Sequence, residues 1–464
     1  YVAPVLPGGD EPHYLIITQS LLADGDLRIE NNHRQRDYAP YAKGLLKPDY
    51  LRRGVDREIY SIHMPGISVL VAPAFALGGY PLVKVWLACL SALASMVAWR
   101  VAFTVVGSVA GAWFAWAATA LTVPFLFLAF TVYPDGPGGA LVIVALACLV
   151  SVSRRRDRTR AWWLAAGVAP ALLPWFHPRF SVVAMTLGIV LVGRVWRERR
   201  RAAALAAFVV APLVSAAGWF GYYYVIYGTP NPSAPYGHYT QMAASNAWRG
   251  LTGLLVDHQF GLGAAAPVYA LACVGLVALV RREGRLGWEW LVVVLPYSVV
   301  SAMYHMWWAG HSSPARFLGP VMLACGLPVA AAWRETTNRA TRVLQACLLA
   351  VSLAFAGLMV GVEQGRLAFN TRDGFALWAV WASRGVDVAR ALPSVFRVDA
   401  TTAVESALIW IALMVCAWLV FRLAATRAWL PPGAAALGFT VSLVAGATMA
   451  MSATWRLEGV GGVT

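Results

Sequence analysis

The chain of 464 residues is 59% hydrophobic and only 13% charged, with a mean hydropathy of +0.62. Soluble globular proteins contain about a quarter charged residues, so this composition excludes a soluble domain and indicates a protein with lipid as its solvent. The formal net charge of +15 does not indicate nucleic-acid binding, because the arginines lie in short runs between apolar stretches, where the positive-inside rule explains them.

The first 81 residues are mostly polar and precede the first stretch long enough to cross a bilayer. This segment contains the acidic pair Asp10-Glu11, an amphipathic stretch over 14–22, a charged region, and a short apolar helix over 67–78. The pattern predicts two interfacial helices joined by a polar loop, because neither stretch is long enough to span the membrane.

Twelve apolar stretches follow, each of about the length needed to cross ~30 Å of hydrocarbon. They cover 82–105, 109–131, 137–153, 161–176, 179–195, 203–227, 262–280, 287–304, 317–333, 343–362, 402–421 and 429–452. Twelve spans place both ends of the sequence on the same side. Because a polar segment at the start needs a helix to carry it across, we expect a thirteenth helix before residue 1.

The loops between these spans alternate in character. Every second loop is rich in arginine: 154–160, 197–201, 281–285, 334–342 and 422–427. The positive-inside rule assigns these loops to the cytoplasm. The other loops hold all eight histidines and most of the carboxylates. Helix capping alone would spread such residues over both faces, so their one-sided distribution predicts chemistry on the non-cytoplasmic face.

These features predict an all-α integral membrane protein with three parts. The parts are an outer segment over 1–81, a transmembrane core over 82–362, and a C-terminal part over 363–464 with an outer loop and the last two spans. All six cysteines lie in apolar stretches and form no Cys-x-x-Cys pair, so neither a disulfide frame nor a thiolate metal site is indicated.

The acidic pair lies at the membrane surface, where a helix begins or ends. A carboxylate near the hydrocarbon boundary loses solvation, which raises its pKa towards the range of a general base. The alternative is a structural helix cap, because Asp10 precedes Pro12 and both residue types are common at helix starts. The spacing leaves both interpretations open.

Several short motifs on the predicted outer face together resemble one known family. They are Asp10-Glu11, His63-Met64-Pro65, Tyr133-Pro134-Asp135, and the segments 227–232, 257–268 and 308–316. In order, spacing and placement they resemble the GT-C superfamily of polyprenyl-phosphate-sugar-dependent glycosyltransferases, whose members include protein O-mannosyltransferases and the lipid A aminoarabinose transferase. The resemblance covers roughly the first two-thirds of the chain.

The resemblance implies a GT-C-like bundle and an inverting transfer of a sugar from a polyprenyl-phosphate donor to an acceptor hydroxyl. The reaction is expected on the outer face of a bacterial cytoplasmic membrane, with a glycan, a lipid or a protein as acceptor. The chain departs from the family pattern at two places. His63-Met64-Pro65 stands where the family often has His-Pro-Pro or Lys-Pro-Pro, and His311 stands where it has a glycine or an aromatic residue.

The resemblance also implies roles for three acidic residues. Asp10 matches the family's catalytic carboxylate and is the expected general base, with Glu11 as the second choice. Asp135 is expected to position the acceptor or to share a metal. The alternative for Asp135 is a structural role in a Pro-Asp-Gly turn.

Basic residues of the same loops are expected to bind the donor phosphate. Arg316 begins a span directly after an outer loop, where a guanidinium can grip a phosphate at the bilayer surface. Snorkelling of the side chain towards the interface is the alternative. His63 and Arg179 are the second candidates for this contact.

Three further outer-loop residues are candidate substrate contacts: His238, Tyr239 and His311. No cofactor is indicated with certainty, and a divalent metal is left open. The outer-loop histidines could join Asp10 or Asp135 in binding one, although no pair shows an HExxH-like spacing.

Two other classes of function are open alternatives. A transporter or flippase for a lipid or sugar would carry ionisable residues or broken helices near the middle of the membrane, and the predicted spans are almost free of charge there. A non-catalytic membrane subunit of a larger assembly would not need the acidic, His-x-Pro and arginine motifs, yet a fold can persist after activity is lost.

Overall fold

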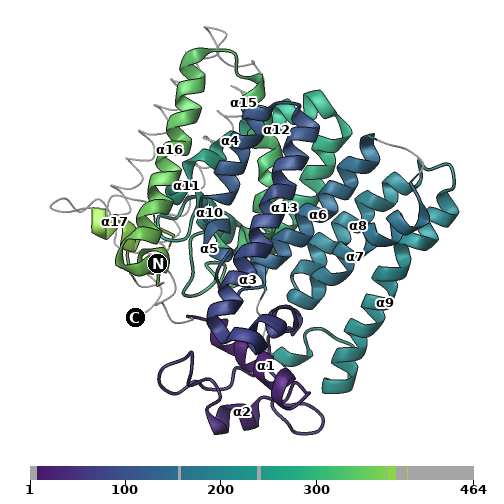
Figure 1. Cartoon of the computed structure of the whole chain (residues 1–464), viewed down its shortest axis with the longest axis vertical. Coiled ribbons are helices and arrows are strands. Elements are labelled where there is room, and N and C mark those ends of the chain that lie inside the picture. Colours follow the sequence, from purple (N-terminus) through teal and green to yellow (C-terminus); the bar gives the residue numbers. More distant parts are fainter. Residues whose placement is uncertain (1–7, 155–157, 238–241, 372–373, 383–393, 396–464) are drawn as a thin grey trace.

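The computed structural model describes residues 8–154, 158–237, 242–371, 374–382 and 394–395. In these residues the chain forms helices and three isolated β-bridges, which agrees with the predicted all-α class. The long helices run side by side as a bundle, and α1 (Glu11–Ala23) and α2 (Glu30–Gln35) lie at one end of it (Figure 1).

Helix α1 is more deeply buried than an interfacial helix. The predicted stretch over 14–22 was expected to show one apolar face. Instead Tyr14, Leu15, Ile16 and Ile17 are all buried in succession, because α1 packs along α3 (Gly66–Val106). The expectation of a helix with one apolar face is therefore wrong for this element.

Helix α3 joins the predicted short helix over 67–78 to the first predicted span over 82–105. The backbone leaves helical geometry at Gly78 (φ −159°) and at Gly79 (φ 60°). A φ of 60° is accessible to glycine at little cost, so this pair allows a sharp change of direction between the two halves. The short helix therefore leads into the span through a kink.

The predicted span over 109–131 is not one helix. Helix α4 (Val109–Ala120) ends well before 131, and α5 covers only Phe125–Leu128. Pro124, immediately before α5, has no N–H to donate to the preceding turn, which removes one helical hydrogen bond where the helix is interrupted.

The next four predicted spans are close to helices of the structure. Helices α6 (Asp135–Arg154), α7 (Arg160–Phe176), α8 (Phe180–Val195) and α9 (Arg201–Tyr227) begin and end within two residues of the expected positions. A polar segment with η1 (Ala234–Tyr236) and α10 (Asn246–Val256) follows.

The predicted span over 262–280 begins irregularly. It starts as α11 (Leu262–Ala265) and η2 (Pro267–Tyr269), and the regular helix is α12 (Ala270–Glu283). Helix α13 (Arg285–Met303) then returns to the end of the bundle that carries α1.

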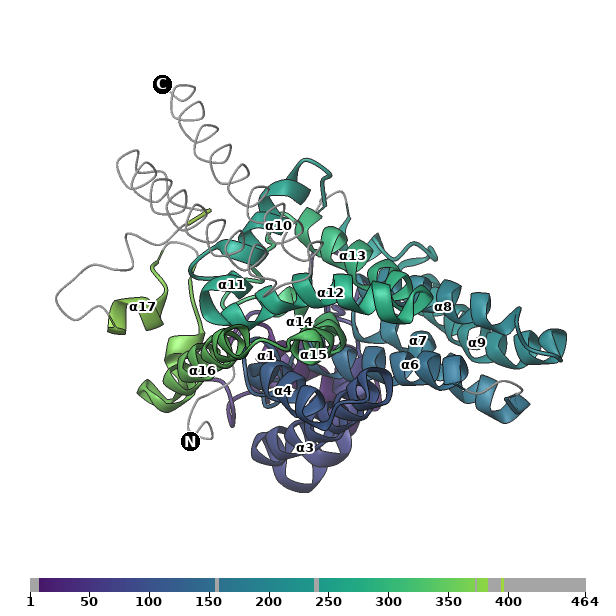
Figure 2. The ribbon, with the colours of Figure 1, turned by 90° about the horizontal axis from the view of Figure 1, so that it is seen from above.

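The segment Arg316–Glu335 forms the centre of the bundle. It consists of η3 (Arg316–Leu318), α14 (Gly319–Met322), η4 (Leu323–Cys325) and α15 (Gly326–Glu335), and 94% of its most apolar window is buried. Seen end-on, α15 lies between α4 and α12, with α16 (Arg339–Gly361) beside it (Figure 2), and α14 packs against α6. The described chain continues through η5 (Glu363–Ala368) to α17 (Leu377–Ala382).

Six segments of the described chain are long and apolar enough to cross a membrane. They are α3, α6, α9, α13, the segment Arg316–Glu335 and α16, and two shorter apolar helices are α4 and α8. These helices support an integral membrane protein. The predicted number of twelve spans is not confirmed, and the last two predicted spans lie outside the described residues.

The arginine-rich loops meet at the end of the bundle opposite to α1. Arg154 contacts Glu283 at 3.1 Å, Arg282 contacts Glu335 at 3.4 Å, and Arg285 donates to the carbonyl oxygen of Gly193 at 2.9 Å. These contacts tie together the ends of α6, α8, α12, α13 and α15. The described basic loops therefore lie at one end of the bundle, while α1 and the acidic motifs lie at the other (Figure 1).

The contact between α12 and α15 generates a test of the packing. A Cβ atom at Gly275 would overlap the carbonyl oxygen of Pro328, so we expect Gly275→Ala to lower the free energy of unfolding by about 1–3 kcal/mol. Gly357→Ala in α16 is the control, because its Cβ would meet nothing within 4 Å. Thermal unfolding in detergent measures both variants. Equal losses of Tm would contradict the close α12–α15 contact.

Candidate functional site

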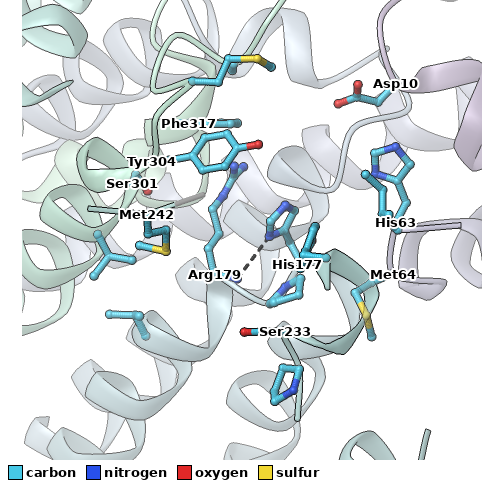
Figure 3. A pocket seen from close by; sticks show the side chains of 18 of the residues that line it. Asp10, His63, Met64, His177, Arg179, Ser233, Met242, Ser301, Tyr304 and Phe317 are labelled. Atoms are coloured by element: carbon cyan, nitrogen blue, oxygen red, sulfur yellow. Dashed lines mark hydrogen bonds between the residues drawn. The ribbon is translucent and has the colours of Figure 1, made fainter. Parts of the chain in front are cut away.

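A cavity of 630 Å³ lies at the end of the bundle that carries α1. Its charged and titratable wall consists of Asp10, Asp49, His63, His177, Arg179 and Arg316. Apolar and hydroxyl-bearing side chains complete it, among them Ser233, Met242, Ser301, Tyr304 and Phe317 (Figure 3). A cavity of this size with a few convergent polar groups is typical of a small-ligand or substrate site.

The loop before α1 fixes the position of Asp10. Gly9 has a φ of +57°, and a Cβ there would meet the hydroxyl of Tyr133 and the carbonyl oxygen of His311. Only glycine fits this left-handed, crowded position easily. The Tyr133 hydroxyl also donates to the carbonyl oxygen of Gly8 at 2.9 Å. Asp10 therefore follows a loop held from both sides.

Asp10 occupies the N-cap position of α1, but its side chain makes no capping hydrogen bond. Its Oδ2 instead contacts a guanidinium nitrogen of Arg316 at 3.3 Å. The side chain stays 41% exposed, and it borders the cavity. The position agrees with the helix-cap interpretation, whereas the carboxylate itself is directed to the cavity.

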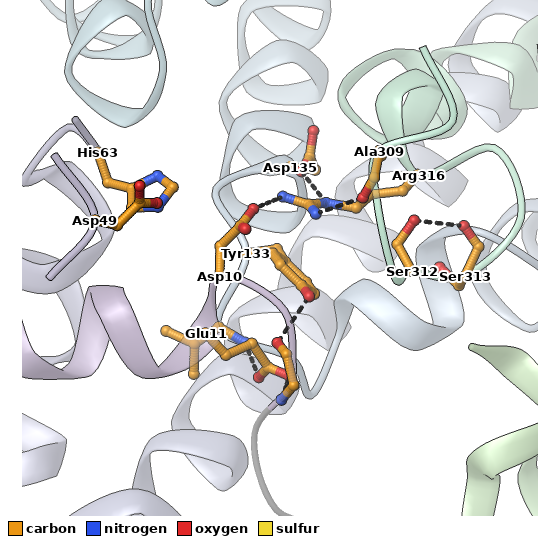
Figure 4. Close-up of polar contacts among 12 residues, drawn as sticks. Asp10, Glu11, Asp49, His63, Tyr133, Asp135, Ala309, Ser312, Ser313 and Arg316 are labelled. Carbon is orange, nitrogen blue, oxygen red and sulfur yellow. Dashed lines mark hydrogen bonds and ion pairs between the residues drawn. The ribbon is translucent and has the colours of Figure 1, made fainter. Parts of the chain in front are cut away.

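Arg316 is the central cation of the site (Figure 4). Its Nε lies 3.1 Å from Asp135 Oδ2, and a third nitrogen donates to the carbonyl oxygen of Ala309 at 3.3 Å. The guanidinium lies 3.5 Å from the centre of the Tyr133 ring, a cation–π contact. Arg316 is therefore buried and directed inward, which excludes the snorkelling alternative.

Asp135 links two arginines. Its second carboxylate oxygen contacts Arg179, whose guanidinium stacks 3.7 Å from the centre of the Phe317 ring. Asp135 is fully buried and is a charge partner of both guanidiniums. Asp135 therefore does not serve only as a turn residue. Its carboxylate holds together the starts of α6 and α8 and the segment at Arg316.

The electrostatic environment of Asp10 differs from the expectation. Burial would raise the pKa of this carboxyl, but the nearby Arg316 and then His63 outweigh it, so the pKa lies below its ordinary value. The expectation of a pKa raised by desolvation at the membrane surface is therefore wrong for Asp10. The carboxylate is held ionised at neutral pH.

Glu11 lies next to Asp10 in sequence but does not border the cavity. Its carboxylate accepts hydrogen bonds from the backbone N–H of Val132 at 2.7 Å and of Gly8 at 3.3 Å. Burial raises the pKa of Glu11 to about 7, in spite of these two donors. The geometry gives Glu11 the role of an anchor between α1 and the loop before α6, which disfavours it as the second choice of base.

His63 forms an ion pair that the sequence motifs did not indicate. Its Nε2 lies 2.9 Å from Asp49 Oδ2, and both residues border the cavity. Burial opposes the charged form, but Asp49 and Asp10 outweigh it and raise the pKa of His63. Asp49 belongs to no motif, and its place among the outer-loop carboxylates was the one signal that could have indicated it.

The candidate substrate contacts have different outcomes. His238 and Tyr239 lie outside the described residues. His311 is not part of the cavity wall; its ring stacks on Phe369 with 5.6 Å between ring centres and lies beside Gly8. Tyr236 and Tyr304 border the cavity instead, and the sequence analysis did not single them out for this role.

The part of the chain that the structure describes contains no preformed set of metal ligands. No group of three or more His, Cys, Asp or Glu side chains is arranged to hold an ion there. The ring centre of His13 lies 5.9 Å from that of His63 and 6.4 Å from that of His33.

Solved structures provide the comparison with known proteins. ArnT from Cupriavidus metallidurans in the apo state superimposes with a TM-score of 0.52 and 19% identity, over 97% of this chain and 73% of ArnT. ArnT bound to undecaprenyl phosphate gives a TM-score of 0.48 and 15% identity, over 97% and 74%. The archaeal oligosaccharyltransferase AglB from Archaeoglobus fulgidus, in complex with an inhibitory peptide and a dolichol-phosphate, gives 0.45 and 12%, over 82% and 54%.

The apo ArnT match establishes a shared fold. ArnT, the lipid A aminoarabinose transferase, has the GT-C architecture, so the predicted GT-C resemblance is confirmed at the level of the fold. No protein-family model matches the sequence, and no curated protein matches it significantly.

The environment of Glu11 generates a test by pH. The pKa of about 7 in the folded chain lies above the ordinary value of 4.5, so the folded chain holds this proton more tightly and loses stability as pH rises through that window. We expect Glu11→Gln to gain Tm relative to the unsubstituted protein between pH 5 and pH 8. Glu30→Gln is the control, because Arg53 holds the pKa of Glu30 below its ordinary value despite partial burial. Parallel Tm curves for Glu11→Gln and the unsubstituted protein would contradict the assignment.

Proposed function

We propose that the chain is a membrane glycosyltransferase that moves a sugar from a polyprenyl-phosphate donor to an acceptor hydroxyl, with Asp10 as the general base. The observation that carries the proposal is one cavity in which the Asp10 carboxylate contacts the buried guanidinium of Arg316, while Arg179, joined to Arg316 through Asp135, borders the same cavity. The fold shared with ArnT supports this class of reaction, and the site supplies the chemistry.

The cations suit the phosphate of the donor. A polyprenyl tail stays in hydrocarbon, so its phosphate can reach only residues near the ends of the spans. Arg316 begins the central segment and Arg179 directly precedes α8, and both border the cavity. Guanidiniums bind phosphate oxygens through paired N–H groups, and His63 offers a further cationic contact. The proposal therefore assigns Arg316 to the donor phosphate, with Arg179 and His63 as additional contacts.

The reaction follows from these positions. Asp10 takes the proton of the acceptor hydroxyl, and the oxygen attacks the anomeric carbon of the donor. The bond from that carbon to the phosphate oxygen breaks, and the electron pair leaves with the phosphate, whose negative charge increases. Attack from the side opposite to the leaving phosphate inverts the anomeric carbon. The nearby cations stabilise the growing charge and hence the transition state.

Placement in the membrane follows the same proposal. The described arginine-rich loops lie at the end of the bundle remote from the cavity, and the positive-inside rule directs such loops to the cytoplasm. The cavity would then open at the outer face of a bacterial cytoplasmic membrane. The acceptor hydroxyl would belong to a glycan, a lipid or a protein that reaches this face, and Asp135 would orient the site through the two arginines.

The role of Asp10 is tested by Asp10→Asn. Purified protein is incubated with a panel of polyprenyl-phosphate sugars, with and without divalent cations, and hydrolysis or transfer is measured. We expect a loss of turnover of about 10²–10⁴-fold with donor binding nearly unchanged, because the amide keeps the shape and removes the base. Asp24→Asn, an exposed carboxylate of the same outer segment, is the control. Full turnover by Asp10→Asn would rule out Asp10 as the base.

The role of Arg316 is tested by donor affinity. We expect Arg316→Ala to weaken donor binding by about 1.5–3 kcal/mol, the usual value of a charge-assisted contact. Arg316→Lys should restore part of the affinity, because an ammonium lacks the planar fork. Arg34→Ala removes an outer cation whose side chain is 78% exposed and serves as the control. With folding checked by Tm, an unchanged dissociation constant for Arg316→Ala would refute this donor site.

A further inference from the structure

The contact between Asp49 and His63 brings together two segments of the first outer region. Asp49 Oδ2 lies 2.9 Å from His63 Nε2, and both side chains border the cavity (Figure 4). The segments are also joined through the backbone, because the N–H of Ile62 donates to the carbonyl oxygen of Asp49 at 3.1 Å. An isosteric change of the Asp49 carboxylate would therefore leave this backbone contact in place.

Charged and titratable groups face His63 from several elements. Asp49 and Asp10 favour the protonated form of His63, whereas Arg316 disfavours it. His13 of α1 has its ring centre 5.9 Å away, and burial lowers the pKa of that histidine to about 4. Burial also lowers the pKa of His177, which borders the same cavity. Both neighbouring histidines are therefore neutral near pH 7, and neither competes with His63 for its charge.

The protonation of the His63 ring determines which N–H group is available as a donor to a ligand. A protonated ring has two N–H donors, at Nδ1 and Nε2. Asp49 Oδ2 lies 2.9 Å from Nε2 and forms the ion pair on that side of the ring. Among the described residues no hydrogen bond to Nδ1 of His63 is formed, so this second donor remains for a molecule in the cavity. The Tyr14 ring, 4.6 Å from the His63 ring, packs against the imidazole and limits its rotation.

We propose that Asp49 is a positioning residue that holds His63 as an oriented cation on the cavity wall, so that Nδ1–H of His63 donates to the phosphate of the lipid-linked substrate. The inference rests on the proposed function and adds a residue to it. A carboxylate behind an imidazole fixes the orientation of the ring and favours its charged form. The donor affinity of the chain therefore depends on pH through His63, and Asp49 sets the pH at which affinity falls.

The sign of the effect follows from linkage. In the unsubstituted protein Asp49 raises the pKa of His63, so the cation persists to higher pH. In Asp49→Asn the pKa of His63 falls, and the cation is lost at lower pH. His63→Lys keeps a cation that does not need Asp49, because an ordinary lysine titrates near pH 10. Its donor binding should be insensitive to a second change at Asp49.

The probe is the methyl ester of undecaprenyl phosphate, a phosphodiester whose single negative charge is constant between pH 5.5 and 8.5 and which lacks a sugar. Dissociation constants are measured across this range by intrinsic tryptophan fluorescence in detergent. We expect Asp49→Asn to bind about tenfold more weakly near neutral pH and at least as tightly as the unsubstituted protein at pH 5.5. Asp56→Asn, a carboxylate of the same outer region that pairs with Arg28 outside the cavity, should keep the unsubstituted profile.

The outcomes separate this inference from the proposed function. An acid shift of the binding profile in Asp49→Asn, absent from His63→Lys and from the double variant, supports the assignment. If the unsubstituted protein binds the probe but Asp49→Asn shows the same profile, or is weakened equally at every pH, the inference is overturned while the proposed function stands. If the unsubstituted protein fails to bind the probe at any pH, the proposed function falls and this inference falls with it.

Discussion

The site depends on one buried contact, in which Asp135 holds the guanidiniums of Arg316 and Arg179. Charges removed from water cost several kcal/mol each unless they are paired, so the shared Asp135 carboxylate stabilises both buried arginines, and Asp10 adds a second partner for Arg316. The rings of Tyr133 and Phe317 provide the surfaces on which the two guanidiniums lie. The contact joins elements that are nearly 200 residues apart in sequence. It therefore fixes both the position of the cavity wall and the cations that border the cavity.

The arginines in turn control Asp10. Each carboxylate oxygen of Asp135 is committed to one guanidinium, and Arg316 turns its remaining side towards Asp10. A phosphate that approaches Arg316 competes with Asp10 for the same nitrogen. In the proposed reaction, donor binding would release Asp10 from Arg316 and raise its pKa towards the range of a useful base. The lowered pKa of Asp10 is thus compatible with catalysis, and it favours donor binding before deprotonation of the acceptor.

Local sequence features predicted much of the fold but only part of the site. Helices α6 to α9 matched because apolar length and arginine-rich ends are local signals. The interruption by Pro124 was missed because the stretch 109–131 is apolar throughout, and the burial of α1 depends on its packing against α3. The sequence indicated Asp10, Asp135, Arg179, Arg316 and His63 as site residues, but charge partners are set by tertiary structure. The pairing of Asp49 with His63 therefore had no sequence signal.

The adjacent acids Asp10 and Glu11 show how a two-residue motif can supply two functions. Successive residues at a helix start point about 100° apart, so one carboxylate can face the cavity while its neighbour faces the bundle. Glu11 accepts from the N–H of Val132, which lies three residues before Asp135. The contact between Glu11 and Val132 therefore fixes both the start of α1, next to Asp10, and the loop that leads to Asp135. Moving the acids apart by even one residue would break this coupling, because the base and the carboxylate that orders the arginines would no longer share a common support.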